Sequence, residues 1–356
     1  MKNHVMVDIK SMDYDSLCAY IIELGEKKFR AEQIYKWLHE KLVTDFDMMT
    51  NIPKSLLEKL KERCYIASFN IVQVLESQID GTRKYLFELA DHNVIESVFM
   101  KYKHGNSVCI STQVGCRMGC KFCASTLDGM ERNLTPSEML EQIYAITRHT
   151  GERISNVVLM GSGEPLDNFD NVLKFLDLIS SEKGLNISQR NLTLSTCGLV
   201  PNIYKLADMK YQITLAISLH ASDDETRKEL MPIAKRYSID EILDACRYYF
   251  EQTGRRLTFE YSLVADVNDT VNGAMKLGEL LKDINCHVNL IPVNPIKERD
   301  FKQSVKDNIE KFKNKLERYG INVTIRREMG RDINGACGQL RKSYNEELLK
   351  VKEGET

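Results

Sequence analysis

Residues 115–123 read Gly-Cys-Arg-Met-Gly-Cys-Lys-Phe-Cys, which places Cys116, Cys120 and Cys123 at C-x3-C-x2-C spacing. Three thiolates from one short loop can each bind one iron of a four-iron cluster. The fourth iron then has no protein ligand nearby, and an open coordination position distinguishes a reactive metal site from a closed structural one. The spacing therefore predicts one 4Fe-4S cluster whose free iron binds a small molecule.

Two other uses of these cysteines have to be compared with the cluster. A structural zinc site usually combines two cysteine pairs, or one cysteine pair with a histidine pair. The chain has no second C-x2-C pair. A disulfide-bonded knot needs an oxidising compartment. An iron–sulfur cluster fits better than either alternative, so we expect the three cysteines to be metal ligands.

The composition indicates a globular protein of the cytoplasm. The 356 residues are enough for one large α/β domain and a smaller one. A hydrophobic share of 43% and a charged share of 28% are typical of globular proteins. The N-terminal residues show no signal-peptide core, and no apolar stretch approaches the ~20 residues that a membrane span needs. We therefore expect a cytoplasmic protein with no membrane partner.

Charge is unevenly distributed along the chain. The formal net charge of -2 argues against a uniformly basic nucleic-acid binder. Residues 297–342, however, hold 13 Lys or Arg against 7 Asp or Glu. A second basic cluster consists of Lys54, Lys59, Lys61 and Arg63. Such patches fit a phosphate backbone and equally fit solvated helix faces, so charge alone leaves RNA binding open.

Apolar spacing divides the chain into a helical part and a strand-rich part. Apolar residues at three- to four-residue spacing predict helices over 16–27, 31–42 and 54–64. We assign residues 1–69 to a small N-terminal helical domain. Continuous or alternating apolar runs then predict lead-in strands over 70–76, 84–89 and 94–101, within residues 70–106.

After residue 107 six strands alternate with six helices. The expected strands are 108–113, 156–160, 191–195, 214–219, 258–263 and 287–291. The expected helices are 136–149, 171–181, 203–209, 239–252, 271–281 and 305–319. Six such units imply parallel strands with helices outside, an α/β fold of the open (β/α)6 partial-barrel kind. The core domain would cover 70–343, with barrel and C-terminal loop over 107–343 and a polar tail over 344–356.

Polar residues stand where several of these strands end. Residues 160–165 read Met-Gly-Ser-Gly-Glu-Pro and follow the second strand. Glycines let backbone approach a ligand, and a carboxylate can accept hydrogen bonds from an ammonium group. Further polar residues at strand ends are Ser195, Ser218, His220 and Asn294. Turn chemistry explains any one of them, but together, at the edge where parallel sheets bind ligands, they favour a binding pocket.

Two cysteines outside the cluster loop are candidates for catalysis. Cys109 lies on the first barrel strand, seven residues before Cys116. Cys337 lies between Gly335 and Gly338, in a segment that predicts an exposed loop. An exposed thiol can act as a nucleophile where its thiolate is populated. The residues themselves leave the role of Cys337 open.

Several strings in this chain occur in the order found in one enzyme family. They are Val-Cys-Ile-Ser-Thr-Gln-Val-Gly-Cys (108–116), Arg-Asn-Leu (132–134), Met-Gly-Ser-Gly-Glu-Pro (160–165), Leu-Ser-Thr (194–196), Ala-Ile-Ser-Leu-His (216–220), Asn-Leu-Ile-Pro (289–292) and Ala-Cys-Gly-Gln-Leu (336–340). With the cysteine loop, the chain resembles the RlmN family of radical S-adenosylmethionine (SAM) enzymes, which methylate C2 of adenine in RNA. The resemblance extends over nearly the whole chain.

The resemblance implies a role for each candidate residue. The cysteines of residues 115–123 would hold the 4Fe-4S cluster, and Cys337 would carry a methyl group. Cys109 would be the resolving thiol, and Glu96 would be the proton acceptor. The SAM contacts would come from Gly163, Glu164, Ser195, Ser218, Leu219, His220 and Asn294.

The reaction implied by the resemblance uses two SAM molecules per turnover. The first would methylate Cys337, and the second would give a radical that activates this methyl group for addition to C2. Cys109 would then release the product by forming a disulfide with Cys337. An external electron donor and a thiol reductant would complete the cycle. The implied substrates are adenosine 2503 of 23S rRNA and adenosine 37 of tRNA, with RNA contacts from residues 1–69 and the basic C-terminal third.

Three alternatives remain at the level of the sequence. A Cfr-type methyltransferase would modify C8 of the same rRNA adenine, and such proteins typically carry cysteine where this chain has Val114. A radical SAM activase would share the cluster without needing Cys337. An iron–sulfur or zinc protein that only binds RNA would cleave no SAM. Two departures from the family pattern are Cys197, where serine is common, and Asn-Gly-Ala at 334–336, where Asp-Ala-Ala is usual.

Overall fold

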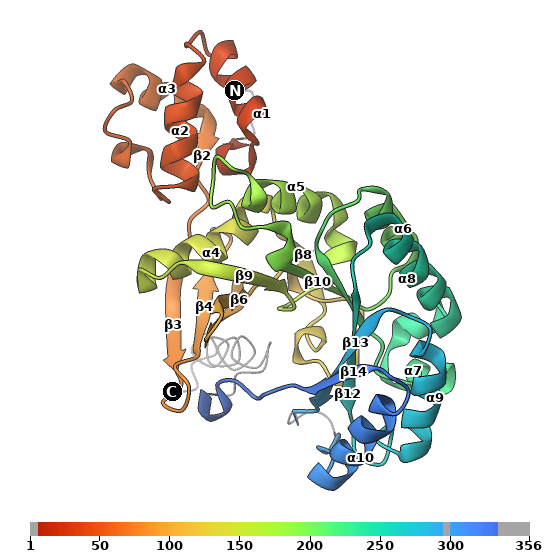
Figure 1. Cartoon of the computed structure of the whole chain (residues 1–356). Coiled ribbons are helices and arrows are strands. Elements are labelled where there is room, and N and C mark those ends of the chain that lie inside the picture. The colour runs from red at the N-terminus through yellow and green to blue at the C-terminus, as the bar shows by residue number, and fades with distance from the viewer. Residues whose placement is uncertain (1–5, 295–299, 334–356) are drawn as a thin grey trace.

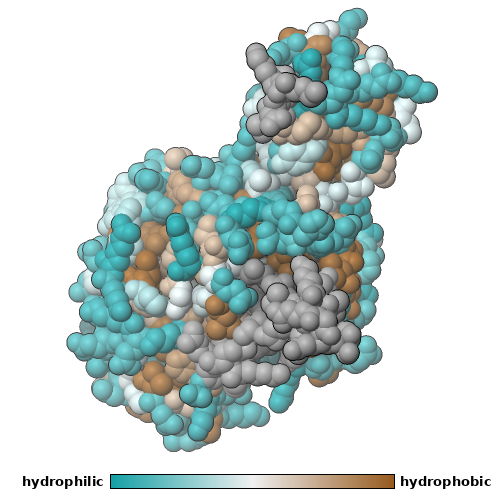
Figure 2. Space-filling model, turned by 180° about the vertical axis from the view of Figure 1, so that it is seen from behind, coloured by the Kyte–Doolittle hydropathy of each residue, from teal (hydrophilic) through white to brown (hydrophobic). Residues whose placement is uncertain are grey.

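The computed structural model describes residues 6–294 and 300–333. Residues 7–65 form an N-terminal lobe that stands apart from the larger body (Figure 1; Figure 2). Its elements are β1 (Val7–Asp8), α1 (Tyr14–Glu23), α2 (Phe29–His39), α3 (Lys54–Arg63) and β2 (Cys64–Tyr65). β1 pairs in parallel with β2, which joins the two ends of the lobe. The lobe has an apolar core of its own, which includes Leu17, Ile34, Leu38 and Leu56.

A buried polar contact fastens the N-terminal lobe to helix α4 (Pro136–Thr150). Lys10 is fully buried, and its Nζ donates a 2.6 Å hydrogen bond to Oε2 of Glu141. The other carboxylate oxygen of Glu141 accepts from Arg148. A buried ion pair is favourable only in close geometry, so this contact fixes how the lobe meets the helix.

The larger body is built on one sheet that has ten strands in the described residues (Figure 1). The strand order is β14-β13-β12-β11-β10-β9-β6-β5-β4-β3. The strands are β3 (Asn70–Glu76), β4 (Arg83–Glu88), β5 (Val94–Tyr102), β6 (Gly105–Cys109), β9 (Ile154–Leu159), β10 (Leu192–Thr196), β11 (Thr214–Ser218), β12 (Leu257–Leu263), β13 (Cys286–Pro292) and β14 (Asn322–Ile325). Pairs from β3 to β6 are antiparallel, and pairs from β6 to β14 are parallel. The C-terminal ends of the parallel strands therefore meet at one edge.

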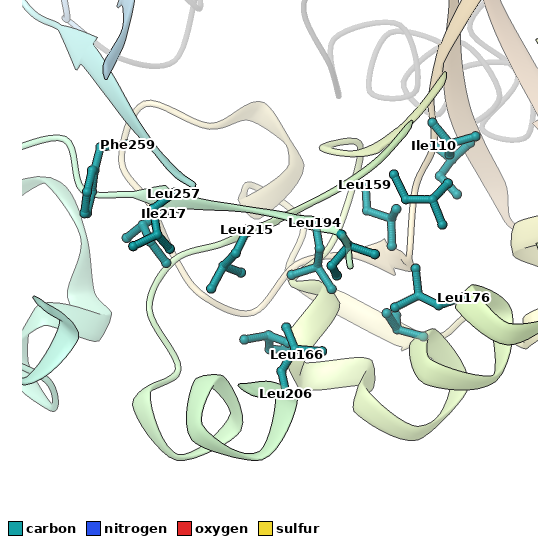
Figure 3. Close-up of a cluster of buried hydrophobic side chains, with 14 of the residues drawn as sticks. Ile110, Leu159, Leu166, Leu176, Leu194, Leu206, Leu215, Ile217, Leu257 and Phe259 are labelled. Carbon is teal, nitrogen blue, oxygen red and sulfur yellow. The ribbon is translucent and has the colours of Figure 1, made fainter. Parts of the chain in front are cut away.

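Helices cover the outer face of the curved sheet (Figure 1). Besides α4 they are α5 (Phe169–Ser180), α6 (Val200–Asp208), α7 (Asp224–Leu230), α8 (Ile239–Thr253), α9 (Val271–Leu281) and α10 (Lys306–Glu317). Leu159, Leu194 and Leu215 from the strands face Leu176 and Leu206 from the helices (Figure 3). Burial of one such side chain stabilises the fold by about 1.5–3 kcal/mol. No helix among residues 6–294 and 300–333 is long and apolar enough to cross a bilayer.

Local sequence explains where the two longest helices begin and end. Thr135 before α4 and Ser238 before α8 each accept a hydrogen bond, through the side chain, from a backbone N–H in the first turn of the helix. In each case a glutamate of that turn, Glu138 or Glu241, accepts from the backbone N–H of the capping residue. Each of these helices ends at a glycine with positive φ, a conformation that other residues rarely adopt. The two helices therefore begin and end within one residue of the bounds expected from the sequence.

The expected open partial barrel is confirmed, and the six expected strand–helix units are all present. Besides short 3-10 helices, this region contains four elements that were not expected: β7 (Gln113–Gly115), β8 (Met130–Asn133), β14 and α7. β14 has four residues and is half exposed, so it carries little apolar pattern. The parallel part of the sheet thus has one strand more than the six that the sequence predicts.

The strand expected over 108–113 is wrong at both ends. β6 begins at Gly105 and ends at Cys109, and Gln113 begins a separate strand, β7 (Gln113–Gly115). The chain leaves the sheet because the Gln113 N–H donates to the Ser162 carbonyl, after which β7 pairs antiparallel with β8. The cysteine loop is therefore held by a small hairpin and does not follow the barrel strand directly.

Candidate active site

A cavity of about 520 Å³ opens at the C-terminal ends of the parallel strands. The expected site residues that line it are Cys109, Cys116, Cys120, Cys123, Gly163, Glu164, Ser195, Ser218, His220 and Asn294. Leu219 and Glu96 do not line it, and Cys337 lies outside the described residues. Site residues that are up to 185 positions apart in the sequence, from Cys109 to Asn294, therefore line the same cavity.

The β7–β8 hairpin holds the cysteine loop at one side of the cavity. The Cys116 N–H donates to the Gly129 carbonyl at 2.8 Å, next to Gly115, whose φ is 77°. A side chain at Gly115 would collide with that same carbonyl oxygen. Glycine is therefore required at this position for the hairpin to close.

The three loop thiols are close enough to influence one another. Burial raises the pKa of Cys116 to about 12, and the neighbouring Cys123 thiol adds to the effect. Burial also raises the pKa of Cys120 well above its usual value, again with contributions from the other two thiols. A cationic metal centre would offset this cost of forming thiolates.

The donor set fits an iron–sulfur cluster better than a single metal ion. In the described part of the chain, no three His, Cys, Asp or Glu side chains surround one point closely enough to hold one ion. In a four-iron cluster each cysteine binds a different iron. Cys116 and Cys120 are buried, Cys123 is half-buried, and all three line one cavity, so the residues fit this group.

Glu164 is held rigidly at the cavity wall. Its Oε1 accepts from the Leu166 N–H at 3.0 Å and its Oε2 accepts from the Cys197 N–H at 2.8 Å. Gly163 precedes it with a φ of 108°, and a side chain there would strike Gln113. Burial raises the pKa of the Glu164 carboxyl, so a cationic ligand would stabilise its ionised form. The carboxylate is oriented to accept hydrogen bonds from an ammonium group.

His220 presents a neutral imidazole to the cavity. Its Nδ1 accepts from the Ser262 N–H at 2.9 Å, and its ring meets the Phe122 ring edge-on at 4.7 Å. Burial lowers the pKa of His220 to about 3, so the ring is uncharged at neutral pH. Because Nδ1 is an acceptor, the proton resides on Nε2, which can donate to a ligand. A φ of 57°, unusual for a residue other than glycine, fixes this orientation.

Two hydroxyls complete the strand-end lining. Ser195 is the last residue but one of β10, and Ser218 is the last residue of β11. Their Oγ atoms lie 3.4 Å apart. Asn294 follows β13 on the same edge. Hydroxyl and amide groups at this spacing can bind the hydroxyls of a sugar or a carboxylate.

Cys109 faces an apolar part of the cavity, where it packs with Val98 and Met100 of β5. Glu96 lies on the same face of β5, because residues two apart on a strand point the same way. Its carboxylate is buried and forms a 3.0 Å ion pair with Lys84. Glu96 therefore lies behind the lining residue Val98, while Cys109 lines the cavity itself.

Sequence reasoning missed Glu260, a carboxylate in the middle of β12 that lines the cavity. Asn289 donates to it at 2.9 Å, and burial raises its pKa. The strand also contains Thr258 and Ser262, so its local pattern does not distinguish this carboxylate. Arg326, Arg327 and Arg331 also line the cavity and make part of its wall basic.

Similarity to known proteins agrees with this geometry. A protein of Lachnospira eligens, named as a probable dual-specificity RNA methyltransferase RlmN, is 64% identical over 96% of this chain and 98% of its own length. The chain belongs to the RlmN family. Another RlmN relative of the same name, from Lachnoclostridium phytofermentans, is 60% identical over 96% of each chain.

A solved structure and two family descriptions agree with the RlmN assignment. The crystal structure of a radical SAM methyltransferase from Sphaerobacter thermophilus matches with a TM-score of 0.89 and 39% identity, over 94% of this chain and 98% of that one. The ribosomal RNA large subunit methyltransferase N-terminal domain matches residues 7–66. The radical SAM superfamily matches residues 110–278, which include the cysteine loop. Membership implies SAM and an iron–sulfur cluster as cofactors.

Proposed function

We propose that this protein methylates C2 of adenine in 23S rRNA and in tRNA, as a radical SAM enzyme with a methyl-cysteine intermediate. The observation that carries the proposal is that Cys109, outside the cluster motif, lines the same cavity as the cysteine loop. An enzyme that only cleaves SAM has no need of an extra thiol there. The similarity to relatives named as dual-specificity RNA methyltransferases supports an RNA substrate.

The residues of the cavity divide into cluster ligands and SAM ligands. Cys116, Cys120 and Cys123 would each hold one iron of the cluster, which would supply the electron that cleaves SAM. Glu164 accepts from the SAM ammonium group, and the other contacts are polar groups at the strand ends. These are Gly163, Ser195, Ser218, His220 and Asn294, while buried Leu219 contributes only its backbone and apolar packing.

Two thiols outside the cluster carry the methyl group and release the product. Cys337 receives a methyl group from one SAM, and a second SAM is consumed to activate that group, so each turnover uses two. After addition to the adenine, the adduct would lose its C2 proton to a base and one electron to the oxidised cluster. Cys109 would then attack the Cys337 sulfur, so that the bond from this sulfur to the transferred carbon breaks and a disulfide forms. A thiol reductant then restores both cysteines, and a separate low-potential donor reduces the cluster.

Glu96 is our proposed acceptor of the C2 proton. Lys84 Nζ lies 3.0 Å from its carboxylate and orients it. It lies two residues from Val98, which lines the cavity beside Cys109. Proton transfer from the adenine would then pass across the β5 face of the cavity.

The cavity entrance suits an unstacked base on a phosphate backbone. Met100, Tyr102 and Met118 offer apolar and aromatic surface against which an adenine can pack. Arg326 and Arg327 line the same cavity and can pair with phosphates. The base must leave its stack to reach the thiols.

Mass spectrometry of nucleosides from RNA incubated with the reconstituted enzyme, SAM and reductant tests the proposal. Wild-type protein should form 2-methyladenosine, and a Cys337→Ala variant should form none. Production of 8-methyladenosine alone would favour the Cfr-type reaction instead. Activity that survives Cys337→Ala would point to an activase, and absence of 5'-deoxyadenosine would exclude radical chemistry.

A further inference from the structure

Arg227 of α7 is a fully buried cation beside the cysteine loop, and nothing in the proposed reaction uses it. Its guanidinium donates to three backbone carbonyls: Nε to Leu219 at 3.1 Å, Nη1 to Tyr237 at 3.3 Å and Nη2 to Cys197 at 2.8 Å. All three partners are neutral. The carbonyls accept from three of the five N–H groups, and none of them carries a negative charge that could pair with the guanidinium.

No carboxylate oxygen of residues 6–294 and 300–333 lies within ion-pair distance of Arg227. Burial lowers the pKa of Arg227, and the groups that raise it are, in order, the thiols of Cys197 and Cys120 and the carboxylate of Asp224. A guanidinium stays protonated in proteins. A buried charge without a paired partner is unfavourable unless an anion is supplied from elsewhere.

The cluster that Cys120 would hold is a source of negative charge on this side of Arg227. Cys120, Cys197, Leu230 and Met231 form one apolar cluster, so the end of α7 packs directly against the cysteine loop. The Lys121 N–H donates to the Leu230 carbonyl at 2.9 Å, which ties the loop to this helix. A four-iron cluster with three thiolate ligands is anionic, and its one-electron reduction adds a further negative charge.

We propose that Arg227 raises the reduction potential of the cluster by stabilising the extra negative charge of its reduced form. Net charge near an iron–sulfur cluster is one of the properties that set its potential, and a buried cation acts through a low dielectric. The step itself is the transfer of one electron from a low-potential donor, with no bond made or broken in the protein. The inference rests on the cluster site of the proposed function.

A purely structural role for Arg227 has to be separated from this electrostatic one. The Cys197 carbonyl accepts from Arg227, while the Cys197 N–H donates to Glu164. Loss of Arg227 could therefore disturb SAM binding without changing the cluster. The reduction potential distinguishes the two roles, because misplacing Glu164 weakens SAM binding but removes no positive charge from the cluster's surroundings.

The test is a redox titration of the reconstituted cluster, without SAM, followed by electron paramagnetic resonance. Arg227→Gln removes the charge, Arg227→Lys keeps it, and Arg227→Met is the second neutral variant should Arg227→Gln not fold. At a fixed potential near the wild-type midpoint, the neutral variants should show a ratio of reduced to oxidised cluster about tenfold lower, equivalent to about 59 mV. Arg227→Lys should stay within about threefold of wild type.

Arg148→Gln is the matched control, because it also removes a guanidinium, but one whose charge is paired with Glu141. Its ratio should equal that of wild type. A neutral variant that folds, carries a full complement of iron and keeps the wild-type ratio would overturn the proposal. A tenfold loss in Arg227→Lys would overturn it too, since the charge is retained. Wild-type protein that binds no cluster would instead contradict the proposed function.

Discussion

In the proposed function, Glu164 is the residue on which recognition of SAM would depend most directly. Its two carboxylate oxygens are already oriented by backbone N–H groups of Leu166 and Cys197. Glu164→Gln removes the charge and replaces one acceptor by a donor that faces a backbone N–H. Because a hydrogen bond to a charged group contributes about 1.5–3 kcal/mol, SAM affinity should fall roughly 10- to 100-fold. Calorimetric titration of SAM into cluster-loaded protein measures the change.

The control for this prediction is Glu241→Gln, which alters an exposed capping residue of α8 far along the chain from the cavity lining. It should bind SAM like wild type. Equal affinity in Glu164→Gln, at equal iron content, would show that the ammonium group is held by other residues.

At the same scale, some roles could be read from residue types and some could not. The cysteine spacing and the strand-end polar residues are local patterns, so the sequence predicts them well. Glu260 and Arg227 carry no local signal, because what makes them unusual is their complete or nearly complete burial, 5% and 0% exposed. Burial is a property of the folded chain as a whole, and a strand or helix pattern does not report it for a charged side chain.

Among the elements, the β7–β8 hairpin should be the most sensitive to substitution. Gly115→Ala places a methyl group against the Gly129 carbonyl and also strains a φ of 77°. Gly129 has a similar φ of 73°, but a methyl group there meets nothing within 4 Å. Gly129→Ala should thus cost about 1–2 kcal/mol from backbone strain alone, and Gly115→Ala distinctly more.

Thermal unfolding and iron content after anaerobic reconstitution test this pair of variants. Gly115→Ala should lose most of its bound iron, because the loop that presents Cys116 can no longer close. Gly129→Ala should load nearly normally. Equal losses in the two variants would mean that strain, and not the collision, governs the hairpin.

The same hairpin explains the main error in predicting the elements. α9 was predicted with its observed bounds because Thr270 caps it and its apolar spacing is regular. The strand over 108–113 was misjudged because Ile110, Thr112 and Gln113 look like a continuous strand. Where that strand breaks is decided by hydrogen bonds to Ser162, some fifty residues away. Contacts between residues so far apart in the sequence cannot be read from the local spacing of apolar residues.

For the molecule as a whole, the junction between the N-terminal lobe and α4 should be sensitive to acid. His39 is buried there, 2.8 Å from the Tyr144 hydroxyl, and burial lowers its pKa to about 3. In the unfolded chain its pKa is about 6.5. Between these values the unfolded chain binds more protons, so the free energy of unfolding falls as the pH drops below 6.5. At pH 5 the loss is about 2 kcal/mol for this histidine.

In the wild-type protein the rings of Tyr35 and His39 lie 4.3 Å apart, centre to centre. His39→Phe removes the titrating group but keeps an aromatic ring at this position. Urea unfolding at pH 7 and pH 5 should show a smaller loss for His39→Phe than for wild type, by about 2 kcal/mol. His220 titrates in both proteins and cancels in the comparison. An identical pH dependence would contradict a neutral, buried His39.

The sheet runs from β14 to β3 without these two strands pairing with each other in the described residues. A fully closed barrel offers its interior only along the axis, through an opening that suits small molecules. An unclosed one has a lateral seam, and a base still attached to a long polymer can enter sideways while the polymer stays outside. The unclosed sheet thus allows an adenine to be modified while it remains part of an RNA chain.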